Sequence, residues 1–193
     1  MDGEAGDDRA RRESLARAFL AYVLVPAWVI PAVADWAFHR RTHIERNAGA
    51  AESITHLAMN AEAGVGIVAS TVFEIDAGVI AVMIAAALAH EATAVLDVAY
   101  AKSRRYVAQA EQHTYSFLEV LPFVNAALAA FAQPRQALAL LGLGGEAPRF
   151  AFRVRRPIPL RTTIVCGACG VLGMGPYVEE FIRCVRARPR GRP

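Results

Sequence analysis

Long uncharged hydrophobic stretches, separated by short charged ones, restrict this chain to folds that embed whole apolar helices. Of its 193 residues, 55% are hydrophobic and 20% are charged, and the mean hydropathy is +0.29. Soluble domains carry about 25% charged residues and a smaller apolar fraction. Lipid offers no hydrogen-bond partners to the protein backbone, but in a helix the backbone groups bond to one another. The sequence therefore predicts an all-α fold, a polytopic membrane helical bundle with four to five hydrophobic helices.

Charged residues and turn formers delimit five hydrophobic segments. These are residues 18–34, 57–73, 77–100, 116–133 and 162–178. A shorter apolar stretch at 136–145 is typical of a helix at the membrane interface. Asp76 is a good N-cap, so the second and third segments should form a hairpin. We predict one membrane-embedded helical domain over 15–183, with a disordered charged tail at 1–14 and a basic tail at 184–193.

The first hydrophobic segment has an alternative interpretation as a signal peptide. It follows several arginines and ends in Ala32-Val33-Ala34, which fits a small-residue cleavage site. However, Pro26 and Pro31 can kink a membrane helix without ending it, and the helical pattern continues beyond this segment. We favour an uncleaved helix and keep cleavage as the alternative.

Basic residues, mostly arginine, flank the hydrophobic segments and give a net charge of +3. Such clusters can contact nucleic acid, but they also mark the cytoplasmic ends of membrane helices. We therefore expect membrane lipid and no nucleic acid as a partner, and we leave a protein partner or a homo-oligomer open. The turn at 74–76 has no Lys or Arg, which predicts that the hairpin tip faces away from the cytoplasm. Simple alternation would put the basic stretch 149–161 on that same side, against the rule.

All five histidines lie between residues 39 and 113, among many carboxylates. Asp35, His39 and His43 are spaced by four residues, so they stack on one side of a helix. Glu52 and His56 have the same spacing. Two helical faces that combine imidazole with carboxylate are therefore expected.

The hairpin also aligns polar residues of its two arms. If it folds about residue 75, His56 is level with Asp97, and Glu62 is level with His90. At a rise of 1.5 Å per residue, the pair His56 and Asp97 lies about 30 Å from the tip. The same layer, near the cytoplasmic interface, should hold the other histidine-bearing stretches.

This combination of residues predicts a metal site. Imidazole and carboxylate are the ligands that iron, zinc and manganese use in proteins, and ionisable groups inside membrane segments indicate function. We expect iron, as a di-metal centre, or manganese or zinc. The predicted ligands are His39, His43, Glu52, His56, His90, Asp97 and His113, with Asp35, Glu62 and Glu111 as additional candidates.

The leading hypothesis is a di-iron-type oxidoreductase that acts on a lipid or other apolar substrate. The same residues could instead line the polar path of a transporter or proton-linked carrier. A third possibility is a non-catalytic membrane module in which they form a structural polar network. Loss of metal binding on mutation would separate the first hypothesis from the other two.

Four stretches of the chain resemble a family of small, uncharacterised bacterial inner-membrane proteins. They are residues 35–45, 52–56, 90–97 and 111–119. The resemblance implies a multi-pass protein of the bacterial inner membrane and no mechanism. Some relatives carry the label diguanylate cyclase, but the Gly-Gly-Asp/Glu-Glu-Phe turn of that activity is absent, and 144–147 is its nearest match.

His39-Arg-Arg-Thr-His43 is also similar to the HxxxH box of membrane fatty-acid hydroxylases and desaturases.

Cys166 and Cys169 form a CxxC pattern inside a glycine-rich apolar run. A redox pair is one interpretation. Small residues also let membrane helices approach closely, and we expect this run to be a helix-packing face.

Overall fold

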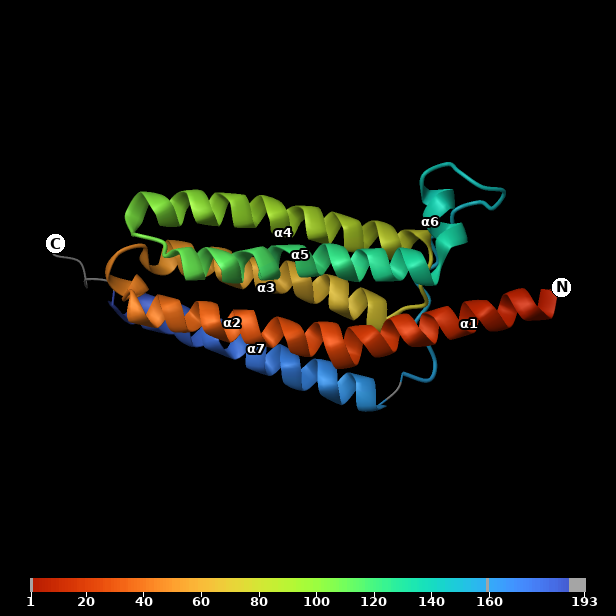
Figure 1. Cartoon of the computed structure of the whole chain (residues 1–193), viewed down its shortest axis with the longest axis horizontal. Coiled ribbons are helices and arrows are strands. Elements are labelled where there is room, and N and C mark those ends of the chain that lie inside the picture. Colours follow the sequence, from red (N-terminus) through yellow and green to blue (C-terminus); the bar gives the residue numbers. More distant parts are fainter. Residues whose placement is uncertain (1, 159, 188–193) are drawn as a thin grey trace.

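The computed structural model describes residues 2–158 and 160–187, and within them the chain is all-α, as predicted (Figure 1). A π-helical turn, Leu20–Leu24, joins the first two helices, and a 3-10 turn, Ile44–Arg46, follows the second. The α-helices are α1 Asp2–Phe19, α2 Val25–Arg41, α3 Gly49–Val72, α4 Ala77–Arg104, α5 Gln109–Ala132, α6 Pro134–Leu140 and α7 Leu160–Ala187.

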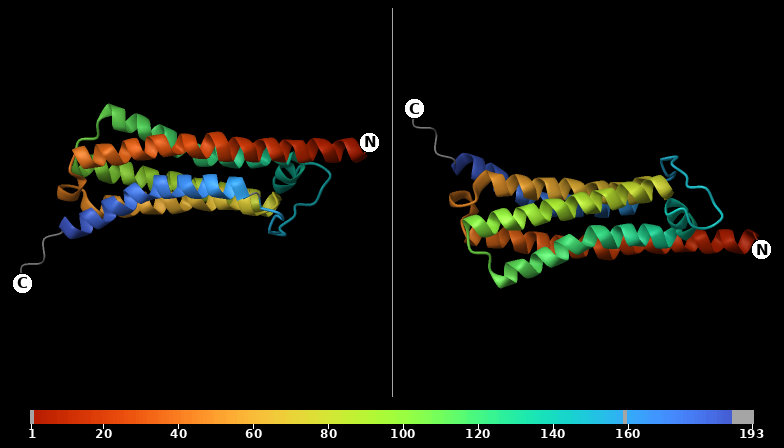
Figure 2. Two further views of the ribbon diagram at one scale, coloured as in Figure 1. Left: turned by 90° about the horizontal axis from the view of Figure 1, so that it is seen from below. Right: turned by 90° about the horizontal axis from the view of Figure 1, so that it is seen from above.

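The long helices lie side by side in one elongated bundle (Figures 1 and 2). Helices α3 and α4 form the predicted hairpin, and α7 packs against α2 and α3. The bundle has two ends. The polar end holds the connections 42–48 and 105–108 and the end of α7. The hairpin end holds the turn 73–76, α6, the loop 141–158 and α1, which projects beyond the bundle (Figure 1).

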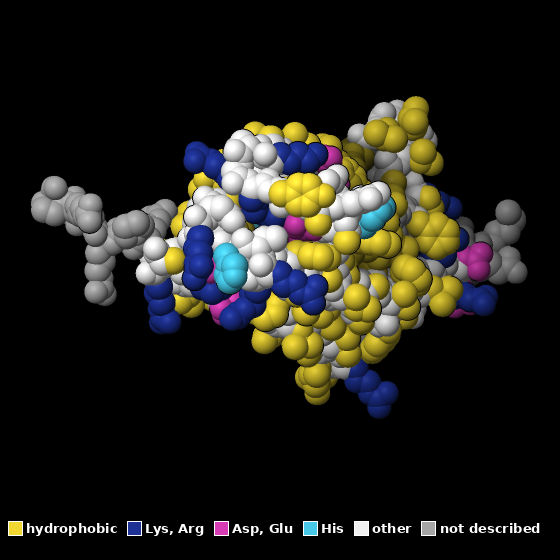
Figure 3. Space-filling view, turned by 60° about the vertical axis from the view of Figure 1, so that its left-hand side comes forward, with side chains coloured by type: hydrophobic (Ala, Val, Ile, Leu, Met, Phe, Trp, Pro, Cys, Tyr) yellow, Lys and Arg dark blue, Asp and Glu magenta, His cyan; other side chains and the backbone are white. Residues whose placement is uncertain are grey.

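Apolar side chains cover the outside of the bundle, while polar ones are buried within it. Ile30 is 74% exposed, Leu96 68% and Val171 73%, and hydrophobic side chains cover much of the face drawn in Figure 3. Among the described residues, three helical segments are long and apolar enough to cross a membrane: Gly6–Arg41, Ala77–Arg104 and Gln109–Ala132. An apolar exterior around a polar interior is what a bilayer requires, so the chain has the build of a membrane protein.

The loop 141–158 is bound to the hairpin tip through backbone hydrogen bonds. Asp76 caps α4 as predicted, because its Oδ1 accepts from the Val79 amide at 2.9 Å. Its Oδ2 accepts from the Ala151 amide of the loop at 2.8 Å. The Gly78 amide donates to the Arg149 carbonyl at 2.9 Å, and a Cβ at Gly78 would lie 2.9 Å from the Phe152 ring. Glycine is therefore required at this close approach.

This loop removes the charge asymmetry that predicted an orientation. The basic residues of 149–156 lie at the hairpin end, together with the arginines of α1. The polar end carries its own basic residues, which gather on the near end in Figure 3. Both ends are thus rich in Lys and Arg, and the positive-inside rule does not choose between them.

Three predicted boundaries differ from the structure. The stretch 2–14 belongs to helix α1 instead of a disordered tail, because Ala, Arg and Glu favour helix and Glu13 pairs with Arg9 and Arg17 one turn away on either side. Helix α5 begins at Gln109, seven residues before the predicted segment. Helix α7 runs to Ala187. The rest of the predicted basic tail lies outside the described residues.

Arg17 ties α1 to the end of α3. Its guanidinium donates to the Ser70 carbonyl at 2.7 Å, the Phe73 carbonyl at 3.2 Å and the Thr71 carbonyl at 3.4 Å. The last carbonyls of a helix have no partner within that helix, and Arg17 is only 6% exposed. It therefore serves as a buried C-terminal cap supplied by another helix.

We predict that Arg17→Leu destabilises the protein by about 1–3 kcal/mol, because buried carbonyls lose their donors. The measurement is thermal unfolding of the detergent-purified protein. Arg11→Leu, at an exposed position of the same helix, is the control and should leave Tm unchanged. Equal Tm values for both variants would contradict this role of Arg17.

Candidate metal centre

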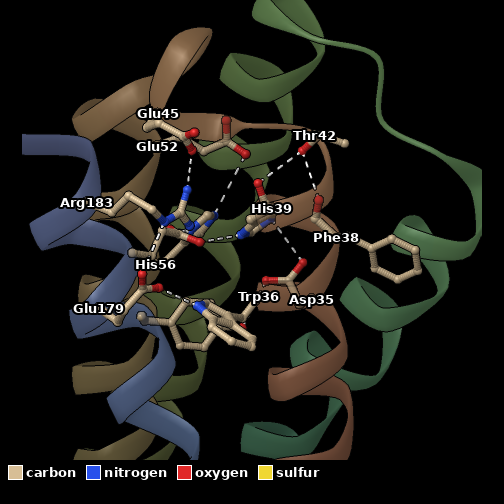
Figure 4. A network of polar contacts seen from close by, with 12 residues as sticks. Asp35, Trp36, Phe38, His39, Thr42, Glu45, Glu52, His56, Glu179 and Arg183 are labelled. Carbon is tan, nitrogen blue, oxygen red and sulfur yellow. Dashed lines mark hydrogen bonds and ion pairs between the residues drawn. The ribbon is translucent and has the colours of Figure 1, made fainter. Parts of the chain in front are cut away.

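Two stacked histidines form the middle of a buried polar cluster near the polar end. His39 of α2 and His56 of α3 have ring centroids 4.6 Å apart and ring planes only 8° from parallel. Their positions relative to the surrounding helices are seen in Figure 4. Glu180 of α7 contacts both rings, with Oε2 at 2.7 Å from His39 Nδ1 and Oε1 at 2.7 Å from His56 Nδ1. An ionised carboxylate only accepts hydrogen bonds, so both Nδ1 atoms donate to Glu180.

The other ring nitrogen of each histidine faces a pair of carboxylates. His39 Nε2 lies 3.2 Å from Asp35 Oδ1 and 3.3 Å from Glu111 Oε1. His56 Nε2 lies 3.4 Å from Asp97 Oδ1 and 4.0 Å from Glu52 Oε1. Within the described part of the chain, both Nε2 atoms are buried and have no hydrogen-bond partner. The Nδ1 contacts are therefore well-formed hydrogen bonds, whereas the Nε2 contacts have ion-pair distances without hydrogen-bond geometry.

This arrangement requires positive charge between each Nε2 atom and its carboxylates. A neutral imidazole that donates from Nδ1 presents a lone pair at Nε2, and a lone pair facing carboxylate oxygens is repulsive. Either a proton or a metal ion can occupy that position. With metal–ligand bonds of about 2.0–2.2 Å, neighbouring ligand atoms lie about 3.0–3.4 Å apart. Three of the four measured separations fall in or next to this range.

The six groups come from four helices in a two-plus-two pattern. Helix α2 supplies Asp35 and His39, and α3 supplies Glu52 and His56, in each case four residues apart. Helices α4 and α5 supply one carboxylate each, Asp97 and Glu111. Di-iron carboxylate bundles likewise use a carboxylate–histidine pair on two helices and a single carboxylate on the other two, but with a pair spacing of three.

Two subsets of these residues already have the spacing of a metal site. Ligand atoms of Asp35, His39 and His56 all lie within 4.8 Å of one another, and so do those of Glu52, His56 and Asp97. All members are buried. These His, Asp and Glu groups could therefore hold a metal ion.

Neighbouring side chains fix the carboxylates in place. Arg105 donates to Glu52 Oε1 at 2.5 Å and to Glu111 Oε1 at 2.6 Å. The Tyr115 hydroxyl donates to Glu111 at 2.7 Å. On the other side, the Tyr177 hydroxyl donates to Asp35 Oδ2 at 2.9 Å. Groups that orient metal ligands in this way are a regular part of metal centres.

The charges of the cluster do not balance with protein groups alone. Five buried carboxylates (Asp35, Glu52, Asp97, Glu111 and Glu180) face one arginine, Arg105, among the described residues. If all are ionised, the excess is four negative charges. Protons on both histidines would halve this excess, whereas two divalent cations would cancel it. Because uncompensated buried charge is costly, bound protons or cations must make up the difference.

Further polar contacts flank the cluster, with Trp36 and Glu179 on one side of His39 and Glu45 on the other (Figure 4). Glu179 accepts from Trp36 Nε1 at 2.8 Å and from Arg40 at 3.1 Å. Glu45, in the α2–α3 connection, pairs with Arg183 of α7. Burial raises the pKa of Glu45, but its backbone hydrogen bond, Arg183 and His43 outweigh this, so that the pKa is lowered overall. Glu45 therefore remains ionised and keeps its tie to Arg183 at neutral pH.

The structure brings six of the ten predicted residues together and leaves four apart. Those in the cluster are Asp35, His39, Glu52, His56, Asp97 and Glu111. His43 and His113 are exposed. His90 is buried, with Nδ1 at 3.0 Å from the Met59 carbonyl, and Glu62 accepts from Thr93 at 2.9 Å. The predicted level of His56 with Asp97 is confirmed by their 3.4 Å contact.

Sequence reasoning missed four contributors: Glu180, Arg105, Tyr115 and Tyr177. Glu180 lies beyond the predicted end of the last hydrophobic segment, in a stretch that gave no periodic signal linking it to the histidines. Arg105 was interpreted as charge flanking a membrane helix. The one available signal was an acidic pair, Glu179 and Glu180, between an apolar run and a basic tail.

Comparison of the chain with protein-family models, with curated proteins and with solved structures gave no match in any of the three. The resemblances to bacterial inner-membrane proteins and to the HxxxH box therefore stay predictions.

We predict that Arg105→Leu destabilises the protein by about 3–5 kcal/mol, since it leaves Glu52 and Glu111 buried without their cation. Arg104→Leu is the matched control, because Arg104 is exposed and its guanidinium lies over the Tyr100 ring, 5.3 Å from the ring centroid. Thermal unfolding in detergent compares the two variants. A similar Tm for both would show that Arg105 does not hold the carboxylates.

Proposed function

We propose that the chain is a membrane metalloprotein that binds two transition-metal ions inside its helical bundle. One observation carries this proposal: two buried Nε2 atoms, on His39 and His56, each face two carboxylates with no hydrogen bond between them. The ligands would be Asp35, His39 and Glu111 for one ion, and Glu52, His56 and Asp97 for the other. Glu180 would orient both imidazoles from behind.

The ligand types support iron, with manganese as the nearest substitute. Four carboxylates and two imidazoles are the set that di-iron and di-manganese carboxylate bundles use, and a zinc site would be expected to contain fewer oxygen donors. Iron at such a site supplies redox chemistry. Because the cluster is enclosed by helices with lipid-facing exteriors, we propose an oxidoreductase that acts on a lipid or another apolar molecule.

We also propose five membrane crossings, with α3 and α7 added to the three more apolar segments. Helix α3 has 24 residues and α7 has 28, so both exceed the roughly 20 residues that a bilayer requires. Three of their charged residues have partners on other helices or connections: Glu52 pairs with Arg105, Glu179 with Arg40, and Glu180 with His39. The bacterial inner membrane is the location that the resemblance described above supports.

The direct test is elemental analysis of the detergent-purified protein. We expect about two equivalents of iron or manganese per chain, the number that the two groups of ligands provide for. His56→Ala should remove at least one equivalent, because Nε2 is a ligand atom. His43→Ala is the matched control: its side chain is 59% exposed, and its metal content should equal that of the wild type.

Two results would overturn the proposal. One is a wild-type protein that contains no metal and takes up none when incubated with Fe(II) or Mn(II). The other is equal metal content in His56→Ala and His43→Ala. Either result would instead support a network of protonated histidines and carboxylates that stabilises helix packing.

A second variant tests the orienting role of Glu180. In Glu180→Gln, the side chain has one acceptor oxygen and one NH2 group in place of two carboxylate oxygens. The NH2 group must face the N–H of one imidazole, so that histidine loses its hydrogen-bond acceptor. Loss of such an orienting group lowers metal affinity by about 10–100-fold, which competition with a chelator measures. Glu179→Gln, with a side chain 41% exposed before substitution, should keep wild-type affinity. Equal affinities in the two variants would refute the orienting role.

A further inference from the structure

A large apolar groove runs along the bundle beside the metal cluster. It has a volume of about 520 Å³ and lies between α2, α3 and α7. Its lining contains no charged residue, and it extends along α3 from Asn60 to Val72, which is about 18 Å at 1.5 Å per residue. Val68, in its wall, is 52% exposed and Met174 is 39% exposed. The groove is therefore open to the exterior of the bundle, where lipid would lie.

The glycine-rich run of α7 forms one wall of this groove. The sequence predicted that this run packs closely against another helix, and the structure shows a different use. A Cβ at Gly167, Gly170 or Gly173 would meet no atom within 4 Å. Because glycine has no side chain, these positions leave open space in the groove and do not form a close contact with another helix. The neighbouring Cys166 and Cys169 pack against the buried cluster around Leu20.

A small cavity lies between the groove and the metal cluster and shares lining residues with both. Its volume is about 30 Å³, and Trp28 and Asn60 line both the cavity and the groove. Its remaining walls include Asp35, His56 and His90. Within the described residues, Trp28 Nε1 and His90 Nε2 are buried polar atoms without a hydrogen-bond partner, and His90 is 2% exposed. Polar groups without partners beside an apolar groove are typical of a ligand site.

We propose that this groove binds one acyl chain of a membrane phospholipid, with the far end of the chain directed toward the cavity beside His56. The proposal that a chain binds here depends only on the groove and not on a bound metal. The further statement that this chain is the substrate rests on the proposed metal-dependent function. In that case the cavity positions a single segment of the chain next to Asp35 and His56, and the apolar walls exclude water from the rest.

Charge at the hairpin end favours a phospholipid over other apolar molecules. The groove reaches Ile158 and Thr163 at that end, and the exposed Arg156 and Arg161 lie within two residues of them in the sequence. Basic side chains at this level would meet the phosphate of a headgroup. The groove lining itself contains no cation, so an anionic headgroup would lie at this end, beside these arginines.

Fluorescence quenching tests the groove, because Trp28 lines it and the chain has only one other tryptophan, Trp36. In the full-length Trp36→Phe protein in detergent micelles, Trp28 emission is titrated with phosphatidylcholine that carries a 9,10-dibromostearoyl chain. We expect saturable quenching. Gly170→Leu adds a side chain within the groove and should weaken binding about tenfold, the effect of overpacking a fitted site by about 1.4 kcal/mol.

Gly175→Leu is the matched control, on the same helix but outside the groove lining. Its Trp28 emission should be quenched to the same extent as in the Trp36→Phe parent protein. Gly167→Leu provides a second groove-filling variant, and circular dichroism checks that each variant retains its helices. Quenching that is unsaturable, or equal in the Gly170 and Gly175 variants, would mean contact with ordinary surrounding lipid and would overturn the proposal. Saturation by free 9,10-dibromostearic acid alone would overturn the phospholipid assignment.

Metal analysis of the same samples separates the two proposals. Saturable quenching in protein that contains no metal and takes up no Fe(II) or Mn(II) would leave the groove assignment standing and the metalloprotein assignment refuted. Two metal equivalents without saturable quenching would refute only the groove assignment.

Discussion

One carboxylate, that of Glu180, determines how the two histidines present their remaining nitrogens. By accepting from both Nδ1 atoms at 2.7 Å it fixes the tautomer and orientation of two rings that stack 4.6 Å apart. It also ties α7 to α2 and α3. Helix α7 is not among the three segments that are apolar enough by composition to cross a membrane. At the polar end its polar contacts come from Glu179, Glu180 and Arg183, beside the packing of Cys184 against Ile44. The architecture of the bundle and the geometry of the cluster therefore depend on the same few contacts.

The bundle separates three environments along its length. Carboxylates and histidines occupy the region near the polar end, a small cavity adjoins them, and an uncharged groove continues toward the hairpin end. Burying five carboxylates is expensive unless each is paired or binds a cation, and Arg105 satisfies only two of them. The cost of this polar interior is the strongest physical reason to assign it a function beyond helix packing.

Much of this arrangement is local and could be predicted. The hairpin and the four-residue spacing of Asp35 with His39 follow from helix geometry. The remainder depends on where helices end and which helices meet. His43 follows the same spacing, but α2 ends at Arg41 and His43 takes a φ of 51°, so the chain turns away. His113 follows Glu111 by two residues, which places it on nearly the opposite side of α5. The contact of Glu180 with His39 spans 141 residues, and no periodicity encodes it.

The position of Glu180 near the end of the chain has a consequence for biosynthesis. All six proposed ligands lie between residues 35 and 111, so they are translated before α7. A ribosome-bound chain can thus contain both imidazoles and all four carboxylates before Glu180, the hydrogen-bond acceptor of both Nδ1 atoms, has been synthesised. Chains are synthesised from the N-terminus at about 5–20 residues per second, so several seconds separate these two stages. During that interval Glu180 is absent from the cluster, and insertion of α7 then brings its carboxylate to both imidazoles.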